Sequence, residues 1–201
     1  MEERLLYARF KSDHGNISLF VCYAPTNDAL DERKDAFYGK LQEGIRRVAR
    51  HDVLICIANF NAIMGCSNEG FEACMGKMGV GGRVSENGVR FGSFYPANDL
   101  VIEGTLFQRH NIHKTTWVSP CGKYKNQIDR IAVSKGHRSS LLDVCVNRGA
   151  DIGSDHHLSV TQLKERIKPS KPTPEPAHIH KRMDGCMIFR ARDIFNSLPY
   201  T

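Results

Sequence analysis

Val53-Leu54-Ile55-Cys56-Ile57-Ala58-Asn59-Phe60-Asn61-Ala62 is the stretch that decides the fold, because an apolar run ends there on two amides that flank a phenylalanine. The residues from 53 to 58 are all apolar, and most of them are Val, Ile or Cys. A run of this kind is typical of a strand that is covered on both faces. We therefore expect a central strand of a sheet at 53–58.

Asn59 and Asn61 lie two positions apart at the end of this run, so in extended geometry their side chains point to the same side. Two interpretations follow. The asparagines can cap the strand and start a turn, since Asn, Gly65 and Ser67 are all good turn residues. They can instead belong to a functional site, because sites are commonly built where strands end. Taken alone, the stretch favours the turn.

Two further clusters favour a site. Gly153-Ser154-Asp155-His156-His157 places a carboxylate beside an imidazole, directly before an alternating run at 158–163, and glycine lets the backbone approach a ligand. Asn126-Gln127-Ile128-Asp129-Arg130-Ile131-Ala132-Val133 sets a lone acid among strand-forming residues, where it can orient an imidazole across the sheet. Each cluster is a weak signal alone, but the three in this order are specific.

With these clusters the sequence resembles the endonuclease/exonuclease/phosphatase superfamily of deoxyribonuclease I and the apurinic/apyrimidinic endonucleases. The branch that it resembles is the endonuclease domain of LINE-type (non-LTR) retrotransposons, including the related host proteins named craniofacial development protein 2. The resemblance covers roughly residues 5–166. It rests on Tyr23-Ala24-Pro25-Thr26, Ala58 to Ala62, Asn111-Ile112-His113-Lys114-Thr115-Thr116-Trp117, Gln127-Ile128-Asp129 and Gly153-Ser154-Asp155-His156-His157.

The resemblance implies an α+β fold, an incomplete four-layer α/β sandwich of the deoxyribonuclease I-like type, with part of the first sheet missing. It also implies which residues meet the substrate. Tyr23 matches a tyrosine that contacts the scissile phosphate, and Asn61 matches an asparagine that stabilises the transition state. Thr116 matches a substrate-contacting threonine, and Trp117 beside it matches an aromatic residue of the active-site wall.

Three further residues match the catalytic groups of the family. His156 matches the histidine that binds and polarises the phosphate, and Asp129 matches the acid that orients this histidine. Asp155 matches an acid linked to the metal and phosphate site. The resemblance therefore implies a hydrolase that acts on phosphodiester bonds of DNA.

Asn59 departs from the family pattern. The family motif reads Gly-Asp-Phe-Asn, whereas this chain reads Ala58-Asn59-Phe60-Asn61, so it lacks the acid that aligns and deprotonates the attacking water. A positioned general base contributes a factor of about 10² to 10⁴ in rate, or about 3 to 5 kcal/mol of barrier. Because Asn is nearly isosteric with Asp, we expect the fold to survive and the chemistry to fail.

Mg²⁺ is the cofactor that the resemblance implies, with Asp155 as a weak ligand. The principal family ligand is a glutamate that precedes the tyrosine motif, and Glu2 and Glu3 near the start of the chain match no motif. We therefore expect the metal-binding part of the domain to be absent. Asp155 alone offers too few hard oxygens to fix Mg²⁺. For the same reason we expect that Asn59→Asp alone does not restore cleavage.

Composition fits one folded unit with a polyanionic partner. The chain has 201 residues, 41% of them hydrophobic, and a net charge of +6, which suits DNA or RNA. Its seven cysteines form no Cys-x-x-Cys pair, and Cys22, Cys56 and Cys145 lie in apolar strand patterns, so we expect a reducing compartment. No signal peptide and no membrane span are apparent. We expect an intracellular protein, nuclear or cytoplasmic, without a stable oligomer.

The hydrophobic pattern predicts an alternation of strands and helices. Strands Leu5 to Phe10 and Ile17 to Ala24 are expected to form a hairpin. A helix follows Asp28, with Leu30, Phe37, Leu41, Ile45 and Val48 on its apolar face. A long loop is expected from Gly65 to Val84, and a second helix is expected to start near Ser85 and to end before Pro96. Further strands are expected at 105–107, 115–119, 127–133, 142–147 and 158–163.

Residues 1–167 are predicted to form a partial endonuclease/exonuclease/phosphatase domain. Four of the eight prolines fall between 169 and 176, which indicates an extended linker over 168–182. The tail 183–201 has no assigned role, and its spacing is compatible with one short helix.

Three functions are compatible with these features. The first is a retrotransposon-derived DNA endonuclease whose activity is weak or lost, and this is the function that we favour. The second is a non-catalytic module that kept the fold and binds nucleic acid or protein. The third is a working phosphodiesterase whose missing part another exon or chain supplies.

Overall fold

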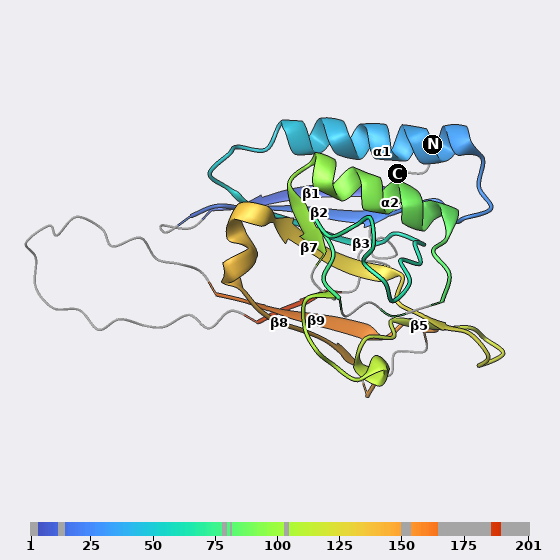
Figure 1. Cartoon of the computed structure of the whole chain (residues 1–201). Coiled ribbons are helices and arrows are strands. Elements are labelled where there is room, and N and C mark those ends of the chain that lie inside the picture. Colours follow the sequence, from blue (N-terminus) through green and yellow to red (C-terminus); the bar gives the residue numbers. More distant parts are fainter. Residues whose placement is uncertain are drawn as a thin grey trace, which may run out of the picture.

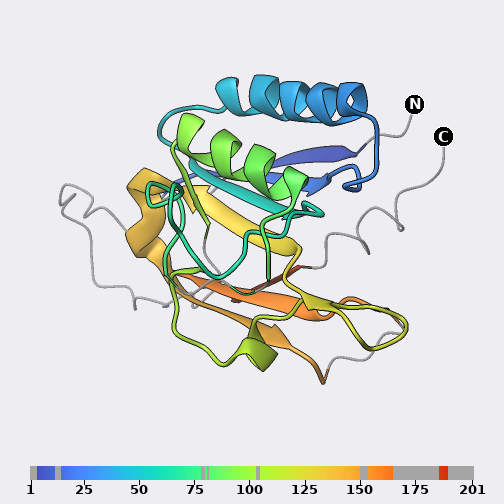
Figure 2. The same cartoon turned by 45° about the vertical axis from the view of Figure 1, so that its right-hand side comes forward.

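The computed structural model describes residues 4–11, 15–77, 80, 82–102, 105–149, 154–164 and 186–189. These residues form three layers (Figures 1 and 2). Helices α1 (Asp31–Arg46) and α2 (Glu86–Ala97) cover one face of a five-stranded sheet, and a three-stranded sheet lies against the other face. This is the α+β architecture that the sequence predicts, with an incomplete first sheet.

The five-stranded sheet has the strand order β1-β2-β3-β7-β4. Strands β2 and β3 run parallel, and each other neighbouring pair is antiparallel. The predicted apolar strand is β3, and it is the central strand, as expected. The turn predicted between β1 and β2 includes residues 12–14, which lie outside the described residues. The strands are β1 (Leu5–Phe10), β2 (Ile17–Tyr23), β3 (Val53–Asn59), β7 (Asp129–Ser134) and β4 (Leu100–Ile102).

The second layer is an antiparallel sheet of β8 (Leu141–Asn147), β9 (Leu158–Leu163) and β10 (Cys186–Phe189), with β9 in the middle. A short hairpin of β5 (Trp117–Val118) and β6 (Lys125–Asn126) lies beside it. Two 3₁₀ turns complete the described elements, η2 (Asn111–His113) and η3 (Lys135–Ser140).

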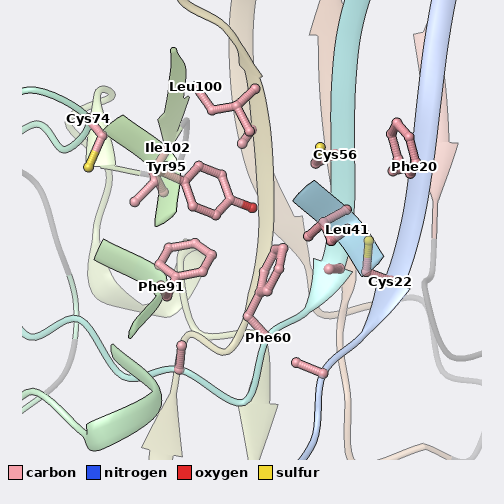
Figure 3. Packing of buried hydrophobic residues seen from close by; sticks show 14 of the residues in the cluster. Phe20, Cys22, Leu41, Cys56, Phe60, Cys74, Phe91, Tyr95, Leu100 and Ile102 are labelled. Atoms are coloured by element: carbon pink, nitrogen blue, oxygen red, sulfur yellow. The ribbon is translucent and has the colours of Figure 1, made fainter. Parts of the chain in front are cut away.

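Alternation along the central strands divides the core into two parts. Leu19, Val21, Ile55, Ile57 and Ile131 form one cluster, which β9 joins through Leu163. The intervening residues of the same strands belong to a second cluster with the two helices. Figure 3 shows its aromatic centre, where the Phe60 and Phe91 rings lie 4.6 Å apart and the Phe91 and Tyr95 rings lie 4.2 Å apart. The residue that follows β3 therefore anchors the helix layer.

Both helices form near their predicted positions, with two corrections. Leu30 was expected on the buried face of α1, but it is 68% exposed because it occupies the N-cap position, outside the helix. Helix α2 was expected to end before Pro96, but it continues to Ala97. The carbonyl of Gly92, which a residue at position 96 would normally bond, lies 3.9 Å from the thiol of Cys74 instead.

Two other predictions were wrong. Thr105 to Phe107 forms a turn, and the strand lies earlier, at Leu100–Ile102, because Asp99 adopts a positive φ of 52° and reverses the chain directly after α2. Residues 186–189 form strand β10, paired with β9, rather than part of a helix. The predicted linker, 168–182, lies outside the described residues.

Cys22 and Cys56 are buried in the core, as predicted, and Cys145 is half-buried. Burial raises the pKa of the Cys56 thiol to about 12. Among the described residues, no helix combines the length and the apolar character that a membrane crossing requires.

Candidate functional site

Three of the predicted site residues lie in one row across the end of the large sheet. Tyr23 on β2 is paired with Asn59 on β3, and Asn59 is paired with Asp129 on β7. Residues that are directly opposite in neighbouring strands point to the same face. This row continues the alternation of Val21, Ile57 and Ile131, so its side chains lie on the face toward the second sheet.

Asn59 is 2% exposed and fixes the turn that follows β3. Its Oδ1 accepts a hydrogen bond from the backbone N–H of Asn61 at 2.9 Å. Asn61 adopts a positive φ of 48°, which asparagine tolerates better than most residues, and its Nδ2 donates to the carbonyl of Ala24 at 2.9 Å. Buried Asn87 donates to the carbonyl of Asn61 at 3.3 Å. Asn59 and Asn61 therefore do form a turn, and this turn lies within the site.

Asp129 and His156 form the predicted pair. Nδ1 of His156 lies 2.8 Å from Oδ2 of Asp129, and both side chains are largely buried. An ionised carboxylate only accepts, so Nδ1 carries the proton that is donated to Asp129. In the neutral ring Nε2 is then the acceptor nitrogen. The backbone N–H of His156 also donates to Oγ of Ser154 at 3.2 Å, which fixes the turn on which the histidine lies.

Thr116 and Trp117 connect this pair to the β5–β6 hairpin. Oγ1 of Thr116 accepts the backbone N–H groups of Ile128 and Asp129, each at 3.0 Å. Nε1 of Trp117 donates to Oδ2 of Asp155 at 2.8 Å, and Trp117 is bridged to His156 through the backbone. Thr116 is buried, and in the structure its hydroxyl holds the backbone at the start of β7 in place. A contact between Thr116 and substrate stays a prediction.

The cation–π contact of Tyr23 is the remaining feature of the row. The guanidinium carbon of Arg4 lies 5.1 Å from the centre of the Tyr23 ring. A contact of this kind contributes about 0.5 to 1 kcal/mol at an exposed site. It places a positive charge beside the tyrosine that is predicted to contact a phosphate.

Basic residues surround the buried side of the site. A cavity of about 10 Å³, with room for about one water molecule, touches Asp129 and Thr116. Four basic residues line it: Arg109, His113, Lys114 and Arg130. Burial lowers the pKa of Lys114 and lowers that of Arg130 to about 10, and at this value the guanidinium stays charged at neutral pH. Several basic residues therefore lie near Asp129.

Oxygens of the site, including one of Asp155, the predicted metal ligand, already accept hydrogen bonds within the protein. Asp129 accepts from His156, Asp155 accepts from Trp117, and the Asn59 oxygen accepts from Asn61. Within the described ranges, no group of three or more His, Cys, Asp or Glu side chains is placed to hold a metal ion. The residues described here thus do not fit a magnesium centre, which prefers several oxygen ligands in octahedral geometry.

All predicted site residues lie on the segments that meet around β3 and β7. Sequence reasoning missed two supporting residues. Ser154 supports His156, and its position two residues before the histidine is a recognisable turn signal. Buried Arg130 follows Asp129 in the chain and was not singled out from the sequence.

Replacing Thr116 tests its positioning part. We expect Thr116→Val to lower the free energy of unfolding by about 1 to 2 kcal/mol, because two backbone N–H groups lose their acceptor while the shape of the side chain is kept. Thr116→Ser keeps the oxygen and serves as the matched control. Urea titration followed by circular dichroism gives both values. Equal stabilities of the two variants would contradict the role of the hydroxyl.

No protein-family model matches the chain. The chain is 33% identical to craniofacial development protein 2 of Bos taurus over 183 residues, which are 91% of this chain and 30% of the relative. It is 33% identical to craniofacial development protein 2 of Tragulus javanicus over 174 residues, which are 87% of this chain and 30% of that relative. The chain thus spans less than a third of the length of these curated relatives.

Solved structures share the fold at low sequence identity. The endonuclease domain of TRAS1, a telomere-specific non-LTR retrotransposon, has a TM-score of 0.56 at 14% identity. The match covers 80% of this chain and 63% of the TRAS1 chain. The 3'-5' exonuclease NExo of Neisseria meningitidis has a TM-score of 0.56 at 20% identity. The match covers 81% of this chain and 66% of the NExo chain. The AP endonuclease LMAP of Leishmania major has a TM-score of 0.58 at 15% identity. The match covers 81% of this chain and 55% of the LMAP chain.

Proposed function

This chain is a homologue of part of craniofacial development protein 2 with the endonuclease/exonuclease/phosphatase fold, and from this premise we propose that it is a retrotransposon-derived DNA-binding domain with impaired endonuclease activity. Its site recognises a phosphodiester and cleaves it slowly or not at all. The proposal concerns the described domain, because the chain spans only about 30% of the curated relatives.

The observation that carries the proposal is the state of Asn59. The side chain lies in the same row as Asp129, but it is an amide and its oxygen is already bonded to the Asn61 N–H. An amide can hold a water molecule but cannot take its proton. The loss of a general base lowers the rate by a factor of about 10² to 10⁴.

The remaining side chains support binding of a phosphodiester. His156, held by Asp129, presents an imidazole to an anion, and Lys114, Arg109 and His113 lie around Asp129 and Thr116. Charge-assisted hydrogen bonds from such groups to phosphate oxygens are strong. The net charge of +6 acts in the same direction at longer range. This function requires a location where DNA is present, and we propose the nucleus or the cytoplasm.

A second candidate function is that of a module that binds nucleic acid or protein without any catalysis. The geometry of Asn59 favours it too, because a side chain that is 2% exposed and committed to a turn is a structural residue. This candidate predicts binding without turnover under every metal condition.

A nicking assay tests the proposal. The 201-residue chain is incubated with supercoiled plasmid and Mg²⁺, beside the double variant Asp129→Ala/His156→Ala as the control for contaminating nucleases. We expect the two proteins to nick at the same low level, since the base is missing in both. Cleavage by the wild-type chain far above the double variant would overturn the impairment.

Binding is measured on the same proteins by fluorescence anisotropy with a labelled duplex. We expect the affinity of the wild-type chain to fall linearly with log salt concentration, because bound phosphates release counterions. The double variant is expected to bind more weakly. Absence of binding at low salt would contradict the nucleic-acid part of the proposal.

A further inference from the structure

Strand β1 is the longer of the two edge strands of the five-stranded sheet. Among the described residues, Leu5–Phe10 pairs with β2 on one side and with no strand on the other. The opposite edge, β4, has only three residues, and Met75 is bridged to it at Ile102. An unpaired edge is a template for a further strand, and proteins usually protect it with lysine, proline, a bulge or a covering segment.

The sequence and geometry of β1 supply little of this protection. Its six residues include no lysine or proline, and its register with β2 is regular at all six positions. Tyr7 lies on the face toward the helices, with its ring 5.0 Å from that of Phe20, and Phe10 lies on the other face. The two are 50% and 52% exposed, so neither neighbouring layer covers them. β1 therefore presents backbone groups and apolar side chains together.

Buried hydrogen bonds fix the polar side chains of this edge. Nε and Nη2 of Arg9 donate to the two carboxylate oxygens of Asp52, at 2.7 and 2.9 Å. The hydroxyl of Ser18 donates to the same carboxylate at 2.8 Å, so it accepts from the Tyr7 hydroxyl at 3.1 Å. The hydrogen bond from Arg9 lowers the pKa of Asp52 to about 2, and the carboxylate stays ionised at neutral pH. The one charge of β1 is thus neutralised within the chain, and two copies of the strand do not repel each other.

The direction of the backbone groups determines how a further strand can pair. The N–H of Tyr23 donates to the carbonyl of Arg4, so Arg4 and every second residue after it point their N–H and C=O groups toward β2. The residues between them, Leu5, Tyr7 and Arg9, point these groups away from the sheet. A strand added to this edge would form its hydrogen bonds with these three residues.

We propose that β1 binds β1 of a second copy of this chain, antiparallel and about a two-fold axis, so that the large sheet continues from one copy into the other. Ala8 then lies at the axis. Tyr7 forms a hydrogen-bonded backbone pair with the partner's Arg9, and Leu6 lies opposite the partner's Phe10. This dimer departs from the sequence-based expectation of no stable oligomer, because composition does not reveal which strand lies at the edge. It does not depend on the proposed binding of DNA.

This register matches the strand to itself. A two-fold axis perpendicular to the sheet sets each face of one copy beside the same face of the other, so odd-numbered residues lie opposite odd-numbered ones. With Ala8 at the axis, the exposed ring of Tyr7 meets the guanidinium of the partner's Arg9, which is a cation–π pair. Phe10 meets the partner's Leu6, which is an apolar pair. Each pair occurs twice in the dimer. With Tyr7 at the axis instead, both kinds of pair would be lost.

Sedimentation equilibrium of the 201-residue chain tests the proposal. A dilution series is expected to show a monomer of 22.6 kDa in equilibrium with a species of twice that mass. Phe10→Lys sets a charge opposite the partner's Leu6 at both ends of the interface, and it is expected to raise the dissociation constant about tenfold or more. Leu142→Lys is the matched control, since Leu142 lies on the edge strand β8 and is also 52% exposed. It is expected to keep the wild-type constant.

A disulfide tests the register. Directly opposite residues of a non-hydrogen-bonded pair have Cα atoms about 4.5 Å apart, which a disulfide can bridge. Ala8→Cys, in a background with Cys66, Cys121 and Cys186 replaced by serine, is therefore expected to form a covalent dimer on oxidation with diamide. Adding Phe10→Lys is expected to abolish this crosslink.

Several results would overturn the interface. One is a wild-type chain that stays monomeric at every concentration. Another is a dimer that persists unchanged in the Phe10→Lys protein, or one that Leu142→Lys dissociates. A dimer without the Ala8→Cys crosslink would overturn the proposed pairing. Circular dichroism of each variant shows that a lost dimer does not come from a lost fold.

Discussion

The variant Asn59→Asp is expected to be about 3 kcal/mol less stable than the wild-type chain in EDTA, and to regain stability when Mg²⁺ is added. Asn59 is 2% exposed and is paired directly with Asp129 across the antiparallel strands. Side chains so placed have Cβ atoms about 4.5 to 5.5 Å apart. A second carboxylate there is desolvated and repelled by the first, so that one of them is protonated or the fold is weakened.

Mg²⁺ reverses this penalty only in the variant. With the substitution, position 59 carries a carboxylate directly opposite that of Asp129, and hard oxygens of this kind bind Mg²⁺. A ligand that binds only the folded state stabilises it by mass action. The wild-type chain, whose amide at position 59 carries no charge, is expected to melt at the same temperature with and without Mg²⁺. Thermal melts in both conditions give the comparison.

Asn147→Asp is the matched control for this prediction. Oδ1 of Asn147 accepts a hydrogen bond from the N–H of Gly149, two residues later, at 3.0 Å. Asn59 makes the same kind of hydrogen bond with Asn61. Asn147 differs from Asn59 in being exposed. It is expected to change stability little. An Asn59→Asp protein that is as stable as the wild-type chain and whose stability does not change with Mg²⁺ would show that Asp129 does not interact with the new carboxylate. Cleavage is a separate property, and we do not expect the single change to restore it.

The positions of the predicted site residues at strand ends could be recognised from sequence, whereas their roles rest on the family resemblance and stay predictions. Tyr23, Asn59 and Asp129 each follow or begin an apolar run, and the pairing of those runs places the three side chains in one row. His156 was recognised as part of a cluster before an alternating run, which is β9, and its role was assigned from the family resemblance. A short apolar run with a clear period indicates which residues face each other in neighbouring strands. That pairing decides which side chains meet at the site.

The predictions that failed depend on contacts distant in sequence or on backbone conformations that the residue types do not reveal. Leu100–Ile102 has too few residues to show a period, and its position depends on the positive φ of Asp99. Residues 186–189 are a strand because they pair with β9, whereas local spacing alone was compatible with a helix. Tertiary pairing overrides local preference in such cases.

Arg130 is a buried cation for which the sequence analysis makes no prediction. It is 2% exposed and is paired with Ala58, which belongs to the core beneath the helices. Its Nη1 donates to Oε1 of Gln127 at 2.9 Å, but within the described residues its Nε and Nη2 have no hydrogen-bond partner. The hydroxyl of buried Tyr95 is also unpaired among these residues. A buried cation with two unpaired donors lowers the stability of the fold.

We therefore expect Arg130→Met to raise the free energy of unfolding by about 1 to 4 kcal/mol, because methionine fills similar volume without a charge to desolvate. The gain is reduced by the Gln127 oxygen, which loses its donor. Arg109→Met is the control, since Arg109 pairs with Asp143 at the surface, where such pairs contribute about 0 to 1 kcal/mol. Urea titration measures both proteins. A less stable Arg130→Met protein would mean that buried water or another segment satisfies the donors of the guanidinium.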